Sequence, residues 1–250
     1  DGGDYWFRAD AGIPTGAGHI LALGVSPGDL NVVFALGSNR QVYKTTNGGT
    51  SWAAASAGLP ADGSGSRASI VFEPGAPNTL YVSWNMSEGS LFKSTDGGAN
   101  WEGHDPLPSK IVRQLVGAAS TPPALYAALG GPGIYKSTDG ALTWSQASSG
   151  LPVDVTAYNV RRIAEDPASP NVLYAVSDND DRVYKTTDGA ASWSAVSTEA
   201  HRFYSIWVQP GTGHVFTIGI DELGASPTYR TCLFRSTDGG VTFSNLSLAH

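Results

Sequence analysis

Three acidic residues lie in segments that the sequence predicts to be loops, and their side chains could act as general acid and base. Asp62 and Asp154 hold matching places, each two residues after a Gly-Leu-Pro triplet, and Glu222 lies in a later loop. Two carboxylates that face each other across a cleft, roughly 6.5–9.5 Å apart, can hydrolyse a glycosidic bond with inversion. Spacing along the chain does not give the separation in space, so all three remain candidates for such a pair.

Cationic side chains recur at the start of the predicted first strand of each repeat. They are His19, Arg67, Arg113, Arg161, Arg162, His201 and Arg202. The guanidinium group matches the geometry of carboxylate and phosphate, so an anionic ligand such as an acidic sugar would fit these positions. Four arginines are our ligand-binding candidates: Arg67, Arg113, Arg162 and Arg202. The alternative is that each arginine pairs with a nearby carboxylate such as Asp62, Asp154 or Glu165.

Three aromatic residues near the same loops could stack on sugar rings. They are Trp84, Tyr158 and Tyr204. A flat aromatic face suits a sugar ring, but it suits ordinary packing equally well. The sequence leaves both interpretations open.

The sequence holds no recognisable motif for a metal or a cofactor. Its five histidines lack zinc-ligand spacing. The acidic run Asp178–Asp181 lacks the glycine and glutamate of a calcium loop. There is no glycine-rich phosphate loop and no Gly-x-Ser-x-Gly turn. We therefore expect neither metal nor cofactor.

A short motif repeats along the chain and determines which elements carry these residues. Its five copies are KTTNGGTSW, KSTDGGANW, KSTDGALTW, KTTDGAASW and RSTDGGVTF, and the opening DGGDYW matches the end of a sixth copy. The equivalent acidic or amide positions are Asp1, Asn47, Asp96, Asp139, Asp188 and Asp238. They are separated by 46, 49, 43, 49 and 50 residues, a period typical of four-stranded propeller blades.

The residues between the motifs predict strands rather than helices. Apolar runs such as Ile20–Val25 and Leu115–Ala118, a Pro/Asn turn, and a second run such as Thr79–Trp84 precede each motif. A third predicted strand, for example Leu91–Ser94, leads into the turn of the motif. Glycine is frequent, at 31 of 250 residues, and charged residues are only 15%, which fits β structure with many tight turns. The predicted fold is an all-β propeller over residues 1–250, with five complete four-stranded blades and one extra N-terminal strand at 1–10. The blades cover about 19–57, 66–107, 111–150, 159–197 and 202–250.

The motif Ser/Thr-x-Asp-x-Gly-x-x-Trp resembles the Asp-box, or BNR, repeat of sialidases, xyloglucanase-type glycoside hydrolases, the sortilin ectodomain and secreted bacterial propellers. The resemblance implies that the box forms the turn between the third and fourth strands and is structural. The aromatic residue after each turn would then pack between blades: Trp52, Trp101, Trp144, Trp193 and Phe243. Alanine replaces the second glycine at Ala141 and Ala190, and we therefore expect no consistent need for positive φ there.

The extra N-terminal strand leaves the size of the assembly open. The chain could be part of a larger propeller, a closed five-bladed ring with a surplus outer strand, or half of a ten-bladed ring built by two chains. An open arc of five blades would expose two apolar blade faces.

Charge and motifs narrow the function to a few classes. A net charge of −7 argues against duplex nucleic acid as the partner, and no apolar stretch is long enough to span a membrane. The first expectation is an extracellular or cell-surface binding scaffold for a glycan or a protein, because every strong motif is structural. The alternative is a glycoside hydrolase of the propeller type, xyloglucanase-like rather than sialidase. We lean towards no enzymatic activity, and the sequence leaves the oligomeric state open.

Overall fold

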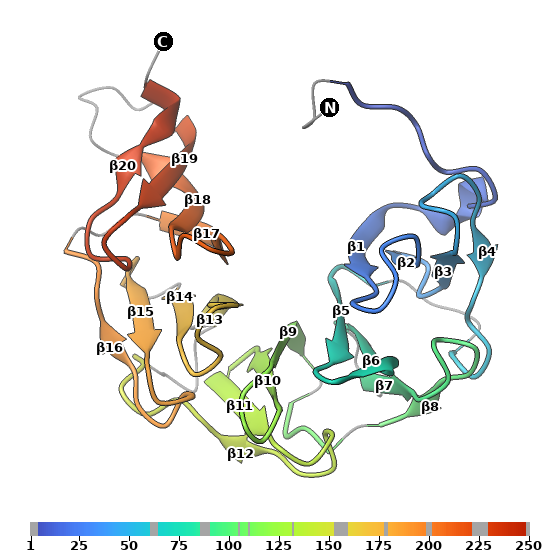
Figure 1. The fold of residues 1–250 in the computed structure, drawn as a ribbon, viewed down its shortest axis with the longest axis horizontal. Coiled ribbons are helices and arrows are strands. Elements are labelled where there is room, and N and C mark those ends of the chain that lie inside the picture. The colour runs from blue at the N-terminus through green and yellow to red at the C-terminus, as the bar shows by residue number, and fades with distance from the viewer. Residues whose placement is uncertain are drawn as a thin grey trace. The chain divides into compact units, whose positions relative to one another are not determined.

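The computed structural model describes residues 5–60, 65–85, 91–104, 106–109, 111–131, 133–152, 160–177, 180–198, 202–221 and 230–248. They form five four-stranded antiparallel sheets, each with its strands in chain order (Figure 1). This arrangement confirms the predicted β-propeller with five blades. Among the described residues no helix is long and apolar enough to cross a membrane.

Two compact units divide the chain, Asp1–Asp105 and Pro106–His250. The first unit holds two blades. Blade 1 contains β1 (Ile20–Val25), β2 (Val33–Gly37), β3 (Val42–Thr45) and β4 (Ala53–Ala54), after the 3₁₀ turn η1 (Thr15–Ala17). Blade 2 contains β5 (Ala68–Glu73), β6 (Ala76–Trp84), β7 (Leu91–Ser94) and β8 (Glu102–Gly103).

The second unit holds three blades. Blade 3 contains β9 (Val112–Ala118), β10 (Ala124–Leu129), β11 (Gly133–Ser137) and β12 (Ser145–Gln146). Blade 4 contains β13 (Val160–Glu165), β14 (Leu173–Ser177), β15 (Val183–Thr186) and β16 (Ser194–Ala195). Blade 5 contains β17 (Arg202–Val208), β18 (Val215–Asp221), β19 (Arg230–Ser236) and β20 (Ser244–Asn245), followed by the 3₁₀ turn η2 (Leu246–Leu248).

Within each unit, neighbouring blades pack face to face, and blade 4 has both of its faces buried in this way, against blade 3 and against blade 5. We call the side towards the next blade the forward face and the other side the rear face. In blade 4 the forward face includes Ala164, Val176 and Val183, which are buried against Phe203 and Val208 on the rear face of blade 5. A strand that is buried on both faces carries apolar residues in a near-continuous run. Such a run differs from the pattern of an amphipathic helix, which is apolar on one side only.

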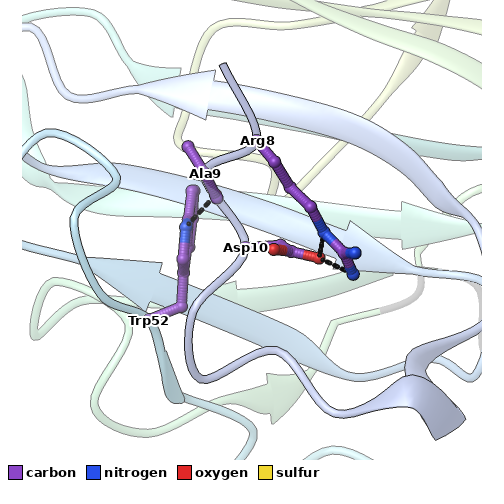
Figure 2. Close-up of polar contacts among 4 residues, drawn as sticks. All are labelled: Arg8, Ala9, Asp10 and Trp52. Carbon is purple, nitrogen blue, oxygen red and sulfur yellow. Dashed lines mark hydrogen bonds and ion pairs between the residues drawn. The ribbon is translucent and has the colours of Figure 1, made fainter.

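The N-terminal segment corrects one prediction. The described residues 5–10 form no strand, so the expected extra strand is wrong as secondary structure. The segment nevertheless packs like the end of a preceding blade. The Trp52 indole Nε1 donates to the Ala9 carbonyl at 2.8 Å, beside an Arg8–Asp10 ion pair (Figure 2). The Trp52 backbone amide donates to Ala11 at 2.8 Å.

The same two bonds recur inside both units. Trp101 donates from Nε1 to Ala55 at 2.8 Å and from its amide to Ala57. Trp193 donates in the same way to Ala147 and Ser149. The residue after each amide acceptor is a glycine with φ near +90°: Gly12, Gly58 and Gly150. A Cβ atom there would lie 2.0–2.1 Å from the tryptophan carbonyl oxygen, so only glycine fits.

Candidate functional site

The first strands of four blades each contain a β-bulge at the same register position. The pairing of first and second strands skips one residue, between Ile20 and Ala22, Val112 and Gln114, Val160 and Arg162, and Phe203 and Ser205. The skipped residues are Leu21, Arg113, Arg161 and Tyr204. A bulged residue has no cross-strand partner, and its side chain is directed differently from its neighbours. In blade 2 the irregularity lies elsewhere, between Phe72 and Glu73.

Three of these bulged residues follow one another in the second unit, where β9, β13 and β17 are neighbours. An Arg113 guanidinium nitrogen lies 3.4 Å from the Val160 carbonyl oxygen, on the next first strand. The Arg161 guanidinium lies over the Tyr204 ring, 4.6 Å from its centre. We call Arg113, Arg161 and Tyr204 the bulge row. The row brings two cations and one aromatic ring together at the starts of three strands.

Further polar contacts involve blades 4 and 5, which carry Arg161 and Tyr204. An Arg162 guanidinium nitrogen donates to the Arg161 carbonyl at 2.9 Å. Arg202 lies 3.9 Å from the Asp181 carboxylate, and the Tyr184 hydroxyl donates a short hydrogen bond to Asp180. Burial, with the bond to Asp180, raises the pKa of Tyr184 to about 12. Tyr184 therefore stays a neutral donor across the physiological range.

The bulge row has the chemistry of an anion-binding and stacking site. Arginine binds carboxylate or phosphate through two parallel N–H bonds, and an aromatic ring beside it holds the guanidinium in a fixed plane. Arg113 is 8% exposed, so its role is to support the row, while Arg161 and Tyr204 are half-buried and accessible. Among the described residues no group of three His, Cys, Asp or Glu side chains could hold a metal ion.

The structure separates the predicted ligand-binding residues. Arg113 and Tyr204 belong to the bulge row, and Arg162 and Arg202 lie on the same strands as Arg161 and Tyr204. Arg67 lies in the other unit, where its side chain is exposed. Trp84 is fully buried, and its Nε1 donates to the Gly37 carbonyl at 3.2 Å. Trp84 therefore fills the core between blades 1 and 2, and the stacking role predicted for it is wrong.

Four predicted catalytic or ligand-binding residues lie outside the described residues. They are Asp62, Asp154, Tyr158 and Glu222. Asp1, the predicted box residue of the partial first copy, lies outside them as well. The sequence analysis named Arg162, and not Arg161, as a ligand-binding candidate, but only Arg161 belongs to the bulge row. A double arginine at the start of an apolar run was the only signal, and the bulge that distinguishes the two leaves no mark in the sequence.

Glu165 is an acidic residue at a strand position that is apolar in three other blades. In the register of the first and second strands it corresponds to Val25, Phe72 and Val208. Its carboxylate accepts a hydrogen bond from the Ala119 amide at 3.2 Å, rather than from the arginine partner that the sequence allowed. Burial raises the pKa of Glu165 to about 7, opposed by the Ala119 bond and assisted by the charge of Asp166.

The boxes are structural turns. In blade 4 the Thr186 hydroxyl donates to Asp188 at 2.6 Å, and Asp188 accepts from the Ser192 amide and hydroxyl. These bonds hold the pKa of Asp188 at about 2. The same pattern recurs at Asp96, Asp139 and Asp238, and at Asn47 with an amide oxygen. The carboxylates are thus occupied with their own turns and are not arranged for catalysis.

Two details of the box differ from expectation. Ala141 and Ala190 have φ of 67° and 68°, so the second glycine position does need positive φ even where alanine stands, at some strain. The Trp144 indole nitrogen is buried without a hydrogen-bond partner among the described residues, unlike Trp101 and Trp193. The expected packing between blades is clear for Trp193, which is 3% exposed in the core shared by blades 3 and 4.

Comparisons with known proteins agree with the fold. A family model described as DUF6242 beta propeller domain matches residues 25–246. No curated protein matches the sequence significantly. Among solved structures, the GH74 xyloglucanase from Xanthomonas campestris is similar over 92% of this chain and 38% of its own, with 19% identity and a TM-score of 0.70.

Two other similar structures involve bound proteins or peptides. YCF48 bound to D1 peptide is 19% identical over 92% of this chain and 82% of its own, with a TM-score of 0.60. A structure of the Nidogen/Laminin complex is 12% identical over 82% of this chain and 75% of its own, with a TM-score of 0.61. The chain spans 38%, 32% and 49% of the three GH74 proteins it resembles, and similarity at these identities concerns the fold alone.

Proposed function

This chain belongs to the family of DUF6242 beta propeller domains, and from that premise we propose that it is a binding propeller that captures an acidic segment of a partner protein. One observation carries the proposal. Three consecutive first strands each place one bulged residue at the same register position: Arg113, Arg161 and Tyr204. Arg113 donates to the Val160 carbonyl, directly before Arg161, and Arg161 lies over the Tyr204 ring. Strand pairing does not require arginine or tyrosine at a bulge position, because a bulged residue has no cross-strand partner.

The chemistry of the bulge row favours binding over catalysis. Its guanidinium groups suit a carboxylate, and its ring suits a flat or apolar neighbour of that carboxylate. Structures similar to this chain include YCF48 bound to D1 peptide and the Nidogen/Laminin complex, which supports a protein partner. An acidic glycan would offer the same kind of carboxylate, and the test below distinguishes a glycan ligand from a protein partner. We also propose that binding occurs outside the cell, an idea that rests on the resemblance to secreted Asp-box propellers.

The alternative of glycoside hydrolysis has less support. It rests on the fold shared with GH74 xyloglucanase, and the carboxylates that would perform it lie outside the described residues. The described box aspartates are bound in their own turns.

The test compares Arg161→Ala with Arg67→Ala. Arg67 is also an arginine at the start of a first strand, but its blade has no bulge there. The probes are peptides rich in Asp and Glu, the same peptides with Asn and Gln instead, and uronic-acid oligosaccharides. A lost charge-assisted hydrogen bond is worth about 1.5–3 kcal/mol, so Arg161→Ala should weaken binding of acidic peptides roughly 10- to 100-fold.

Three results bear on the proposal. The Arg67→Ala variant should bind as the parent does, and the amide peptides should bind neither protein. Binding of the oligosaccharides alone would replace the protein partner with a glycan. Equal binding by parent and Arg161→Ala would reject the bulge row as the site.

A further inference from the structure

A cavity of about 280 Å³ lies between blades 1 and 2, within the first unit. Its two walls belong to blades that pack against each other, because Phe34 of β2 meets Phe72 of β5 with ring centres 5.9 Å apart. Val32 and Pro77 complete its apolar surface. Sites for drug-sized ligands measure roughly 300–1,000 Å³, so this cavity suits a smaller molecule.

The residue paired with the lysine before the box distinguishes blade 1 from three other blades. Blades 2, 3 and 4 place a tyrosine there: Tyr81, Tyr126 and Tyr174. The Tyr126 hydroxyl donates to the Gly189 carbonyl, in the box of the next blade, at 3.1 Å. Blade 1 places Phe34 opposite Lys44, and Phe34 has no hydroxyl to offer the matching carbonyl of Gly97. The junction of blades 1 and 2 therefore lacks a polar group that the junction of blades 3 and 4 contains.

Two opposite charges line the cavity, Lys44 and Asp29. Lys44 Nζ donates to the Gly97 carbonyl at 2.7 Å, and an ammonium group has three N–H donors, so two are left for a ligand. Asp29 accepts the backbone and side-chain amides of Asn31 at 2.9 and 3.2 Å, both on Oδ1. Within the described ranges neither Lys44 nor Asp29 forms an ion pair. The cavity thus presents a cation and an anion that do not neutralise each other.

Two neutral groups add hydrogen-bond donors to the same cavity. Asn78 holds the place in blade 2 that Asn31 holds in blade 1, since each backbone carbonyl accepts a glycine amide of a box. Blade 2 has Ala76 where blade 1 has Asp29, so no carboxylate holds the Asn78 side chain, and it makes no hydrogen bond to the part of the chain that the structure describes. Ser26 is 8% exposed. Its hydroxyl accepts the Gly28 amide at 3.3 Å and keeps its own proton to donate.

We propose that this cavity binds a free α-amino acid with an apolar side chain. The α-carboxylate binds Lys44, with Ser26 and Asn78 as neutral donors, and the α-ammonium binds Asp29. The side chain packs on the apolar surface around Phe72. A simple acid would leave Asp29 facing an anion, and a simple amine would leave Lys44 facing a cation, so a ligand with both charges complements the cavity best. The cavity and the bulge row lie in different units, and the two proposals can fail independently.

The test is titration calorimetry of the 250-residue chain with four probes. L-leucine carries both charges, 4-methylpentanoate lacks the ammonium group, 3-methylbutylamine lacks the carboxylate, and glucose is an uncharged polyol. Leucine should bind, and each of the other three probes should bind at least about tenfold more weakly.

Four variants locate the binding of leucine. Lys44→Met should weaken it roughly 10- to 100-fold. Lys136→Met is the matched control, because Lys136 makes the same contacts between blades 3 and 4, with the Gly189 carbonyl at 2.9 Å and over the Tyr126 ring. Asp29→Asn keeps an oxygen for the Asn31 amides, and it should weaken leucine but not 4-methylpentanoate. Phe34→Tyr supplies the hydroxyl of the other blades beside Gly97, and it should weaken leucine at least about tenfold.

Several results would overturn the proposal. A parent chain that does not bind leucine removes it, as does one that binds 4-methylpentanoate or glucose as tightly as leucine. Equal losses in Lys44→Met and Lys136→Met would attribute the effect to the scaffold. Full binding of leucine by both Asp29→Asn and Phe34→Tyr, with circular dichroism that matches the parent, would place the ligand elsewhere.

Discussion

Glu165 makes the stability of this propeller depend on pH in an unusual direction. It lies on the rear face of blade 4, at a register position where other blades place Val25, Phe72 and Val208. Burial raises its pKa from an ordinary 4.5 to about 7. The replacement Glu165→Gln keeps an oxygen that can accept the Ala119 amide, and it removes the proton equilibrium.

The magnitude follows from linkage between proton binding and folding. Each pKa unit is worth about 1.4 kcal/mol, so a rise from 4.5 to about 7 corresponds to at most roughly 3.4 kcal/mol. The carboxyl is only half-buried, and screening by solvent reduces the expected effect to about 1–2 kcal/mol. Since the folded state binds the proton more tightly, this stabilisation is complete below pH 4.5 and is lost as the pH rises through about 7.

The assay is urea unfolding followed by tryptophan fluorescence, at about pH 4, 5.5, 7 and 8.5. Relative to Glu165→Gln, the parent should be equally stable at the lowest pH and about 1–2 kcal/mol less stable at the highest. Glu102→Gln, a change at an exposed residue of β8, is the control and should parallel the parent. A constant difference across the whole range, or a parent more stable than Glu165→Gln at about pH 8.5, would refute the reasoning.

Three further substitutions test the scaffold by chemical unfolding. Gly150→Ala should cost about 3 kcal/mol or more, because its Cβ would meet a carbonyl oxygen at 2.1 Å with φ of +87°; Gly103→Ala, with no atom within 4 Å, should cost less than about 0.5 kcal/mol. Trp193→Phe removes a satisfied indole hydrogen bond and should cost about 1–2 kcal/mol more than Trp144→Phe, whose nitrogen has no partner among the described residues. Asp188→Asn should keep the box folded, as Asn47 does in blade 1. Because the pKa of Asp188 is held at about 2, the parent's advantage over it should be present above pH 3.8 and disappear as the pH falls through about 2.

Local sequence predicted the strands best where both ends carry a turn signal. Ile20–Val25 and Leu91–Ser94 were predicted with the bounds that the structure has, because a Pro/Asn turn or a box follows at once. The first strand of blade 3 was predicted as Leu115–Ala118 and runs from Val112. Its early part contains the Arg113 bulge, where apolar and polar residues cease to alternate, and alternation was the only signal available.

The candidate site was harder to predict than the fold. Trp84 and Tyr204 are both aromatic residues near loops, yet one is fully buried between blades and the other lies under Arg161. Their difference depends on which face of the sheet each side chain takes. A bulge adds one residue to the strand, so the side chains beyond it point to the opposite face from the one that strict alternation predicts. The register of a strand is set by its partner rather than by its own sequence.

The repeat supplies an internal comparison that separates scaffold from site. At the box, five blades keep an Asp or Asn, a positive-φ residue and an aromatic residue, and the Asp or Asn side chain accepts hydrogen bonds from its own turn. At the bulge the chain places Leu21, Arg113, Arg161 and Tyr204. The bulge has no cross-strand partner to restrict its side chain, so the scaffold tolerates any of these types. Sheet pairing therefore does not explain the two arginines and the tyrosine on consecutive strands. The contact of Arg161 with Tyr204 is the observation on which the proposed binding site rests.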